Sequence, residues 1–114
     1  NIRSDGKYIR DYIHVGDVVK GYIFLLKKLE KVKGEAFNFS SSDNLSVINL
    51  IKLAQDVLKV KIPFKILNSA KNEIPYQHLN DRKIRKLGWK PNYTIKNTFP
   101  EIIDWYKNKL FVQQ

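Results

Sequence analysis

The sequence predicts a small mixed α/β lobe, with short strands and about four helices in one unit that covers residues 1–114. Residues 7–17 alternate with a period of two, which is typical of a strand. Several longer segments carry apolar residues at helical spacing, which indicates amphipathic helices. These helices carry more apolar surface than a few short strands cover, so the lobe is expected to dock on something larger.

The alternating stretch, KYIRDYIHVGD at residues 7–17, is the most distinctive part of the sequence. As a strand it places a guanidinium between two phenols on one face, with an imidazole beyond them. The four residues are Tyr8, Arg10, Tyr12 and His14. A guanidinium held in this way suits bidentate binding of a phosphate, and the flanking rings limit its motion. An edge strand with a solvated arginine fits the same pattern.

Short strands and capped helices fill the rest of the chain. The strands include the two arms of a hairpin around the turn Asp5-Gly6, and their ranges are residues 2–3, 7–15, 35–40 and 64–67. Each helix begins at a capping residue, and the caps in order are Asp17, Ser46, Asn80 and Thr98. Glycine or proline ends the first three helices, at Gly34, Pro63 and Gly88. For Asp17, a cap is favoured over a catalytic base.

The second half of the chain adds an irregular loop and a final helix. Residues 68–77 have no period, and they form either a functional loop or a plain surface connection. Trp89 is expected to anchor the core. Thr98 and Glu101 form a capping box, with Pro100 in the first turn. The predicted buried side of this helix consists of Ile102, Ile103, Tyr106 and Leu110. Residues 111–114 are expected to fray.

The composition excludes several classes of protein. Cysteine is absent, so the chain has no disulfide framework and no thiolate metal site. His14 and His78 lie far apart in the sequence and suggest no zinc site. No apolar run reaches the roughly 18 residues that a membrane helix needs. The net charge of +10 favours a polyanionic partner, but the lysines are spread along the chain without a recognition motif. Neither nucleic acid nor a membrane is therefore expected as a partner.

Five segments follow one another in a familiar order and spacing: RSDGKYIRDYIHVGD (residues 3–17), GEAFNFS (34–40), NEIPYQHLN (72–80), KIRKLGWKP (83–91) and IIDWY (102–106). Together they resemble the C-terminal, substrate-binding part of the extended short-chain dehydrogenase/reductase family. Its members act on nucleotide sugars as 4-epimerases and 4,6-dehydratases with bound NAD. The resemblance implies the C-terminal part of an extended Rossmann-type fold. The run from Glu73 to Leu79 is most similar to CDP-glucose 4,6-dehydratases.

The resemblance implies how the lobe binds its substrate. Arg10 matches the arginine that grips the diphosphate of the nucleotide sugar, and Tyr12 matches the tyrosine beside it. Glu73 lies where the epimerases carry an acidic residue that bonds the nucleotide ribose. A carboxylate suits that task because it accepts hydrogen bonds from adjacent hydroxyls.

One position departs from the family's pattern. The epimerases place a second arginine three residues before the acidic residue, and this position is Ala70 here. Lys71 offers a point charge in its place, without the planar fork of a guanidinium. Gln77 completes the set of predicted substrate-binding residues. The departure argues against a 4-epimerase.

The redox apparatus of the family has no counterpart in this sequence. The family binds NAD on a glycine-rich turn after its first strand, and the five glycines here form no such motif. None of the six tyrosines has a lysine four residues later, so the Tyr-x-x-x-Lys pair is absent as well. The sequence contains no methionine and opens directly on strand-like residues. The chain is therefore expected to be a fragment that lacks an N-terminal NAD-binding Rossmann domain.

The predicted function is to hold the nucleotide of a CDP-glucose-like substrate in an NAD-dependent 4,6-dehydratase, without catalysis by the fragment itself. In the whole enzyme NAD takes a hydride from the sugar and returns it after water has left. This lobe fixes the nucleotide so that the sugar reaches the nicotinamide. The alternatives are part of a nucleotide-sugar 4-epimerase, or a non-catalytic basic module that binds nucleic acid or a phosphorylated ligand. The family also implies a cytoplasmic homodimer.

Overall fold

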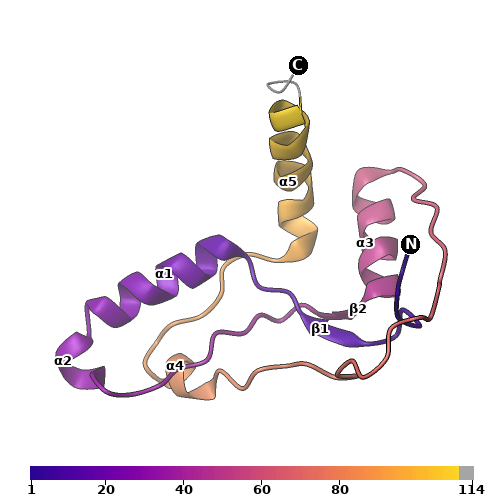
Figure 1. Cartoon of the computed structure of the whole chain (residues 1–114). Coiled ribbons are helices and arrows are strands. Elements are labelled where there is room, and N and C mark those ends of the chain that lie inside the picture. Colours follow the sequence, from indigo (N-terminus) through magenta and orange to yellow (C-terminus); the bar gives the residue numbers. More distant parts are fainter. Residues whose placement is uncertain (111–114) are drawn as a thin grey trace.

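The computed structural model describes residues 1–110, which contain a two-stranded sheet and five helices (Figure 1). In chain order the elements are β1 (Ile9–Asp11), α1 (Val15–Leu26), α2 (Leu29–Val32), β2 (Asn44–Ser46), α3 (Val47–Leu58), α4 (Arg82–Lys86) and α5 (Ile95–Leu110). α3 and α5 rise side by side and contact each other, whereas α1 points away from them, and long irregular connections link the elements. The predicted mixed α/β class is confirmed. The tail predicted to fray, residues 111–114, lies outside the described residues.

The sheet is not the predicted hairpin. β1 pairs antiparallel with β2, in a register that puts Ile9 opposite Ser46. Ile2 makes an isolated parallel bridge with Ile66 instead. Gly6 adopts a φ of +78°, and its carbonyl oxygen accepts a hydrogen bond from the first turn of α3 at 3.1 Å. The turn is therefore tied to α3 and directs the preceding residues away from β1.

Two further predicted strands, residues 35–40 and 64–67, are wrong in the described part of the chain. Both segments run without regular structure, and the second makes only the single bridge from Ile66 to Ile2. A strand needs a neighbour for its backbone N–H and C=O groups. Residues 35–40 pair with no strand within residues 1–110.

The helix α1 begins earlier than predicted, and Asp17 is not its cap. The N-cap is His14, whose Nδ1 accepts a hydrogen bond from the Gly16 N–H at 3.0 Å. Asp17 is buried within the first turn, and its two carboxylate oxygens accept from the backbone N–H groups of Asn92 and Tyr93 at 2.9 and 3.0 Å. This aspartate therefore joins α1 to the segment that leads into α5. The helical region ends in the short α2, followed by the predicted stop at Gly34.

Ser46 caps α3 as predicted. Its Oγ accepts a hydrogen bond from the Asn49 N–H at 3.2 Å. α3 ends at Leu58, before the predicted stop at Pro63, because Lys59 turns into the left-handed region with a φ of +54°.

The predicted core anchor, Trp89, is confirmed. Its side chain is buried, and its ring meets Phe39 edge to face at a centroid distance of 5.1 Å. Phe39 in turn covers Gly21 of α1, where an added Cβ would lie 2.3 Å from the ring. Nearby, Asn80 binds the first turn of α4 because its Oδ1 accepts from the Arg82 N–H at 3.0 Å, although the N-cap position itself is one residue later.

The predicted capping box of the last helix is wrong. α5 begins at Ile95, so Thr98, Pro100 and Glu101 all lie inside it. The cap is tertiary: the Oδ2 of Asp43 accepts a hydrogen bond from the Ile95 N–H at 2.6 Å. The Thr98 hydroxyl donates to a carbonyl of the preceding turn. The local capping box therefore does not form, because a carboxylate from a distant loop caps the helix instead.

Much apolar surface remains exposed. Tyr106 on α5 was predicted to be buried, yet it is 56% exposed, and Ile102 is also exposed. Ile103 is half-buried, and the side chain of Leu110 lies outside the described residues. Another exposed apolar stripe follows α1 and consists of Val15, Val19, Tyr22, Ile23 and Leu26. This surface agrees with a lobe that docks on something larger. Within residues 1–110, no helix is long and apolar enough to cross a membrane.

Candidate functional site

The irregular residues 68–77 run beside β1 and bring Glu73 to Arg10. Two backbone hydrogen bonds hold the segment there: Ile9 donates to the Pro75 carbonyl at 2.9 Å, and Gln77 donates to the Ile9 carbonyl at 3.1 Å. A parallel bridge in this region also involves Ile9. The strand that carries the guanidinium and the loop that carries the carboxylate are therefore fixed to each other by the backbone.

Arg10 is held from several sides. Its Nη1 donates to the backbone carbonyls of Ile9 and Ile74 at 2.9 and 2.8 Å. Its Nη2 donates to the Glu73 Oε2 at 3.2 Å. The guanidinium carbon also lies 5.7 Å from the centre of the Tyr8 ring. With 25% of its side chain exposed, Arg10 is not the solvated edge arginine that the sequence pattern also allowed.

Part of the guanidinium remains available. A guanidinium has five N–H donors, and three of those of Arg10 have acceptors among residues 1–110. The Nε–H and one Nη2–H have none there. Because the two carbonyls fix Nη1, an incoming anion meets a guanidinium that is already oriented.

Tyr12 lies two residues beyond Arg10, directly after the end of β1, and stays a neutral phenol. Burial raises the pKa of this phenol, and the positive charge of Arg10 offsets part of the rise. A neutral hydroxyl both donates and accepts, so Tyr12 suits a polar group of a ligand. Its backbone N–H donates to the Asp43 carbonyl at 3.2 Å.

The other two predicted site residues take less part. Lys71 is exposed, and no ion pair links it to Glu73 in the described part of the chain. Gln77 joins β1 through its backbone, while its side chain is exposed. The structure thus brings Arg10 and Glu73 into contact, with Tyr12 nearby, and leaves Lys71 outside this group.

Asp11 is an organising residue that the sequence reasoning missed. Its carboxylate accepts hydrogen bonds from the Ser40 hydroxyl and from both the backbone N–H and the hydroxyl of Ser41. A longer bond of 3.4 Å comes from the Leu79 N–H. Asp11 therefore ties β1 to the loop before β2 and to the end of the Glu73 loop. A signal existed, because a carboxylate on an otherwise aliphatic strand face needs donors when it is buried.

This network predicts how stability depends on pH. Burial raises the pKa of Asp11, but the hydrogen bonds from Ser40, Ser41 and Leu79 outweigh it, so the pKa lies below the usual value of 3.8. A carboxyl whose pKa is depressed by folding stabilises the fold above the unfolded pKa, and this contribution is lost as pH falls through the folded pKa. We expect the free energy of unfolding of Asp11→Asn to fall less steeply below about pH 4 than that of the parent. Urea unfolding at a series of pH values measures this.

The matched control is Asp56→Asn, because Asp56 is exposed on α3. It should keep the pH slope of the parent protein. An equal slope in the parent and in Asp11→Asn would contradict the assignment.

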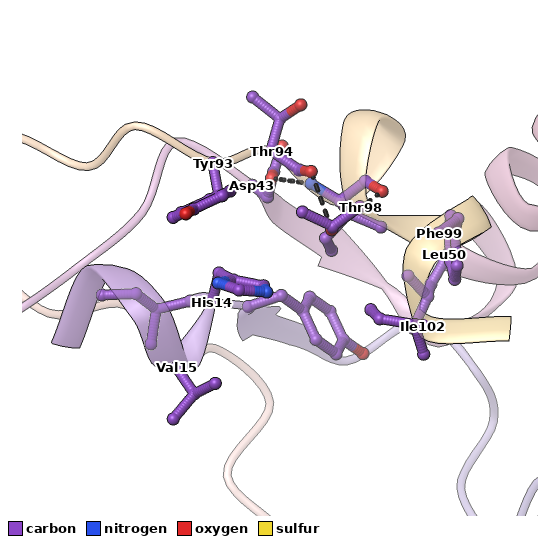
Figure 2. Close-up of a pocket in the computed structure, with 12 residues that line it drawn as sticks. His14, Val15, Asp43, Leu50, Tyr93, Thr94, Thr98, Phe99 and Ile102 are labelled. Carbon is purple, nitrogen blue, oxygen red and sulfur yellow. Dashed lines mark hydrogen bonds between the residues drawn. The ribbon is translucent and has the colours of Figure 1, made fainter. Parts of the chain in front are cut away.

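An apolar cavity of about 360 Å³ lies beside this network, between the end of β1, α3 and the start of α5 (Figure 2). Its lining consists of Tyr12, Ile13, His14, Val15, Asp43, Leu50, Tyr93, Thr94, Ile95, Thr98, Phe99 and Ile102. The rings of His14 and Tyr93 lie against each other along one wall, with their centroids 4.2 Å apart and their planes tilted by 34°. Arg10 and Glu73 do not line the cavity, which shares only Tyr12 with the predicted site. The cavity suits apolar groups with few polar contacts.

A second, polar cavity of about 490 Å³ lies beside α4. Three cations and two amides line it together with one alanine: Ala36, Asn38, Asn80, Arg82, Lys83 and Lys86. Lys83 is engaged already, because its Nζ donates to the Ala36 carbonyl at 3.0 Å and lies 2.9 Å from the Glu35 carboxylate. Arg82 and Lys86 are exposed and form no ion pair within residues 1–110.

Comparisons with known proteins match this chain to one group. Residues 1–40 match the profile described as "NAD dependent epimerase/dehydratase family". The chain is 32% identical over 106 residues to a UDP-glucose 4-epimerase of Cyamopsis tetragonoloba, which covers 90% of this chain and 30% of that protein. It is 27% identical to the CDP-paratose 2-epimerase of Salmonella typhi, with 91% of this chain and 32% of that protein covered. The chain thus spans about a third of the length of the relatives that it matches.

The solved structures that resemble this chain belong to the same group of enzymes. A UDP-glucose 4-epimerase superposes with a TM-score of 0.77 at 29% identity, covering 91% of this chain and 32% of the other. The UDP-glucose-4-epimerase from Stenotrophomonas maltophila, solved with bound NAD and formylated UDP-arabinopyranose, gives a TM-score of 0.83 at 25% identity. It covers 95% of this chain and 33% of that one. The lobe therefore has the fold of one third of a Rossmann-type sugar-nucleotide enzyme.

Proposed function

We propose that this chain, a relative of the NAD-dependent epimerase/dehydratase family, is the part of such an enzyme that binds the nucleotide diphosphate of a nucleotide sugar. The single observation that carries the proposal is the contact between Arg10 and Glu73, at 3.2 Å, on a strand and a loop that the backbone holds together. A cation for the diphosphate and a carboxylate for the ribose are then in adjacent places.

The chemistry of the two groups fits the two halves of such a ligand. A guanidinium binds phosphate oxygens through charge-assisted hydrogen bonds, and the backbone orients that of Arg10 in advance. A carboxylate accepts from the neighbouring hydroxyls of a ribose. Tyr12 adds a neutral phenol close to the same ligand. Lys71 and Gln77, both exposed, are the proposed contacts at the open side of the site.

NAD would be held by another domain of the parent enzyme. This chain has neither the glycine-rich phosphate-binding turn nor the Tyr-x-x-x-Lys pair, so its residues do not fit the cofactor. When bound in such an enzyme, NAD would supply reversible hydride transfer at the sugar. The task of this chain's own residues is to fix the nucleotide, so that binding energy from the remote end of the substrate positions the sugar.

The exposed apolar stripe on α1 is the proposed docking face for that domain. The stripe is continuous along the helix, from Val15 to Leu26. Next to it, residues 36–39, which have no regular structure, have backbone N–H groups without a backbone partner within residues 1–110. An apolar helix face beside unpaired backbone N–H groups suits the edge of a sheet that is covered by helices, where residues 36–39 would gain a neighbouring strand. A dinucleotide-binding α/β domain presents such an edge.

Two reaction classes are consistent with this role. The run from Glu73 to Leu79 and the absence of an arginine at Ala70 favour a 4,6-dehydratase acting on a CDP-glucose-like substrate. The relatives in the comparisons are mostly UDP-glucose 4-epimerases, and they favour a 4-epimerase. Incubation of the complete enzyme with UDP-glucose and CDP-glucose separates them, because dehydration lowers the mass of the product by one water and epimerisation leaves it unchanged.

Calorimetric titration tests the proposal. We expect UDP or CDP to bind to the full chain and Arg10→Ala to weaken this binding by more than about tenfold, since a hydrogen bond to a charged group contributes roughly 1.5–3 kcal/mol. The matched control is Arg82→Ala, which removes an exposed arginine from the polar cavity beside α4.

Unchanged affinity in Arg10→Ala would remove Arg10 from the site. A greater loss of affinity in Arg82→Ala than in Arg10→Ala would favour the basic module, in which the cations around α4 hold the phosphorylated ligand. Such a module would also lose affinity steeply with added salt, with a log–log slope of several units.

A further inference from the structure

We infer that Glu73 makes the Arg10 site selective, so that it accepts a diphosphate attached to a ribose and rejects a diphosphate without one. The inference rests on the proposed function and deepens it. Glu73 does so by holding one Nη2–H of the guanidinium whenever no ribose is present, and by placing its negative charge beside the donors that remain.

The geometry shows a carboxylate that is already engaged. The Oε2 of Glu73 lies 3.2 Å from the Arg10 Nη2, and its Oε1 lies 3.8 Å from the Arg3 Nη2. The Arg3 contact is long and its side chain is 79% exposed, so it contributes little. The Arg10 contact is different because both side chains are mostly covered. Arg10 is thus the principal partner of Glu73 in the structure.

Inorganic pyrophosphate meets a penalty at this site. It must either displace the Glu73 carboxylate or lie beside it, so that two anionic groups share one guanidinium. If displaced, the carboxylate loses its charge-assisted hydrogen bond, and pyrophosphate lacks the pair of neighbouring hydroxyls that a ribose would offer in return. Either path costs binding free energy that the phosphate contacts must offset.

A nucleoside diphosphate avoids this penalty. Its ribose brings two neighbouring hydroxyls that donate to a carboxylate, so Glu73 exchanges Arg10 for the ribose. Arg10 keeps its place during the exchange, because the carbonyls of Ile9 and Ile74 hold its Nη1 independently of Glu73. The guanidinium is therefore released in the orientation in which the diphosphate needs it.

The test compares two ligands in one variant. Calorimetry measures the affinities of inorganic pyrophosphate and of UDP or CDP, whichever binds more tightly, for the parent and for Glu73→Gln. We expect Glu73→Gln to bind pyrophosphate about fivefold more tightly, because the variant no longer forms the partly covered ion pair with Arg10. We expect it to bind the nucleoside diphosphate more weakly. The ratio of the affinity for the nucleoside diphosphate to the affinity for pyrophosphate therefore falls, because the first affinity decreases and the second increases.

The control variant is Glu30→Gln, which removes the same charge from an exposed pair with Lys33 on α2. It should leave both affinities unchanged, and circular dichroism checks that each variant is folded. If Glu73→Gln binds pyrophosphate no better than the parent or Glu30→Gln does, the inference is overturned. If Arg10→Ala also leaves the affinity for the nucleoside diphosphate unchanged, the proposed function fails with it; if Arg10→Ala weakens that affinity, only the selectivity role of Glu73 is lost.

Discussion

Trp89→Ala is expected to lower the free energy of unfolding by about 3–5 kcal/mol, the range for removal of a buried tryptophan. Trp89 is 5% exposed and meets Phe39 edge to face at 5.1 Å. Phe39 fits against Gly21 of α1 so closely that no Cβ could be added there. Removal of the indole therefore leaves a void that this contact cannot refill by a small shift. Urea unfolding followed by circular dichroism measures the loss.

The chain contains its own control for this change. Trp105 on α5 is 55% exposed, so Trp105→Ala should cost less than about 1 kcal/mol. Equal losses of unfolding free energy in Trp89→Ala and Trp105→Ala would contradict the assignment of Trp89 to the core.

Asp17→Ala is expected to cost about 2–4 kcal/mol, because it removes the charged acceptor of two part-buried hydrogen bonds from backbone N–H groups. Its two oxygens accept from the N–H groups of Asn92 and Tyr93. These bonds fix the segment that leads from the buried Trp89 into α5. Without the carboxylate both N–H groups lose their partner in a site where the side chain is 1% exposed.

Asp17→Asn separates hydrogen bonding from packing, since it keeps the shape of the side chain. Its amide accepts only one of the two bonds and turns a donor toward the other N–H, so it should also destabilise the fold. The exposed Asp56→Asn on α3 serves as the reference, with an expected change within about 0.5 kcal/mol. If Asp17→Asn were as stable as that reference, the carboxylate would not be the link between α1 and the last helix.

The sequence predicted local features well where one residue acts on its neighbours. The Ser46 cap, the stop at Gly34 and the burial of Trp89 all appear in the structure. For the candidate site, the resemblance to a family proposed that Arg10 and Glu73 act on one ligand, and the structure brings the two into contact. Their roles toward that ligand remain predictions.

The errors have one physical origin, which is competition from distant parts of the chain. The turn at Asp5-Gly6 favours a hairpin locally, yet β1 pairs with β2. Asp17 resembles a cap, but two N–H groups from more than seventy residues away take its carboxylate. The capping box at Thr98 lost in the same way to Asp43. Spacing along a sequence does not report contacts of this kind, and a buried carboxylate is the signal that points to them.

The exposed apolar surface has a different origin, which is the lack of a cover within residues 1–110. Residues 35–40 have the composition of a strand and lack a neighbouring strand within residues 1–110. The stripe on α1 likewise has an apolar pattern without a cover. We propose that this surface is a docking face for another domain, because its pattern predicts burial that residues 1–110 do not provide.

The most direct test of the central claim is a crystal structure of the protein with bound UDP or CDP. The account predicts the diphosphate on the Arg10 guanidinium and a ribose hydroxyl on Glu73, with the direct contact of 3.2 Å between the two side chains broken. A diphosphate bound in the polar cavity of Arg82, Lys83 and Lys86, with the pair of Arg10 and Glu73 intact, would contradict it.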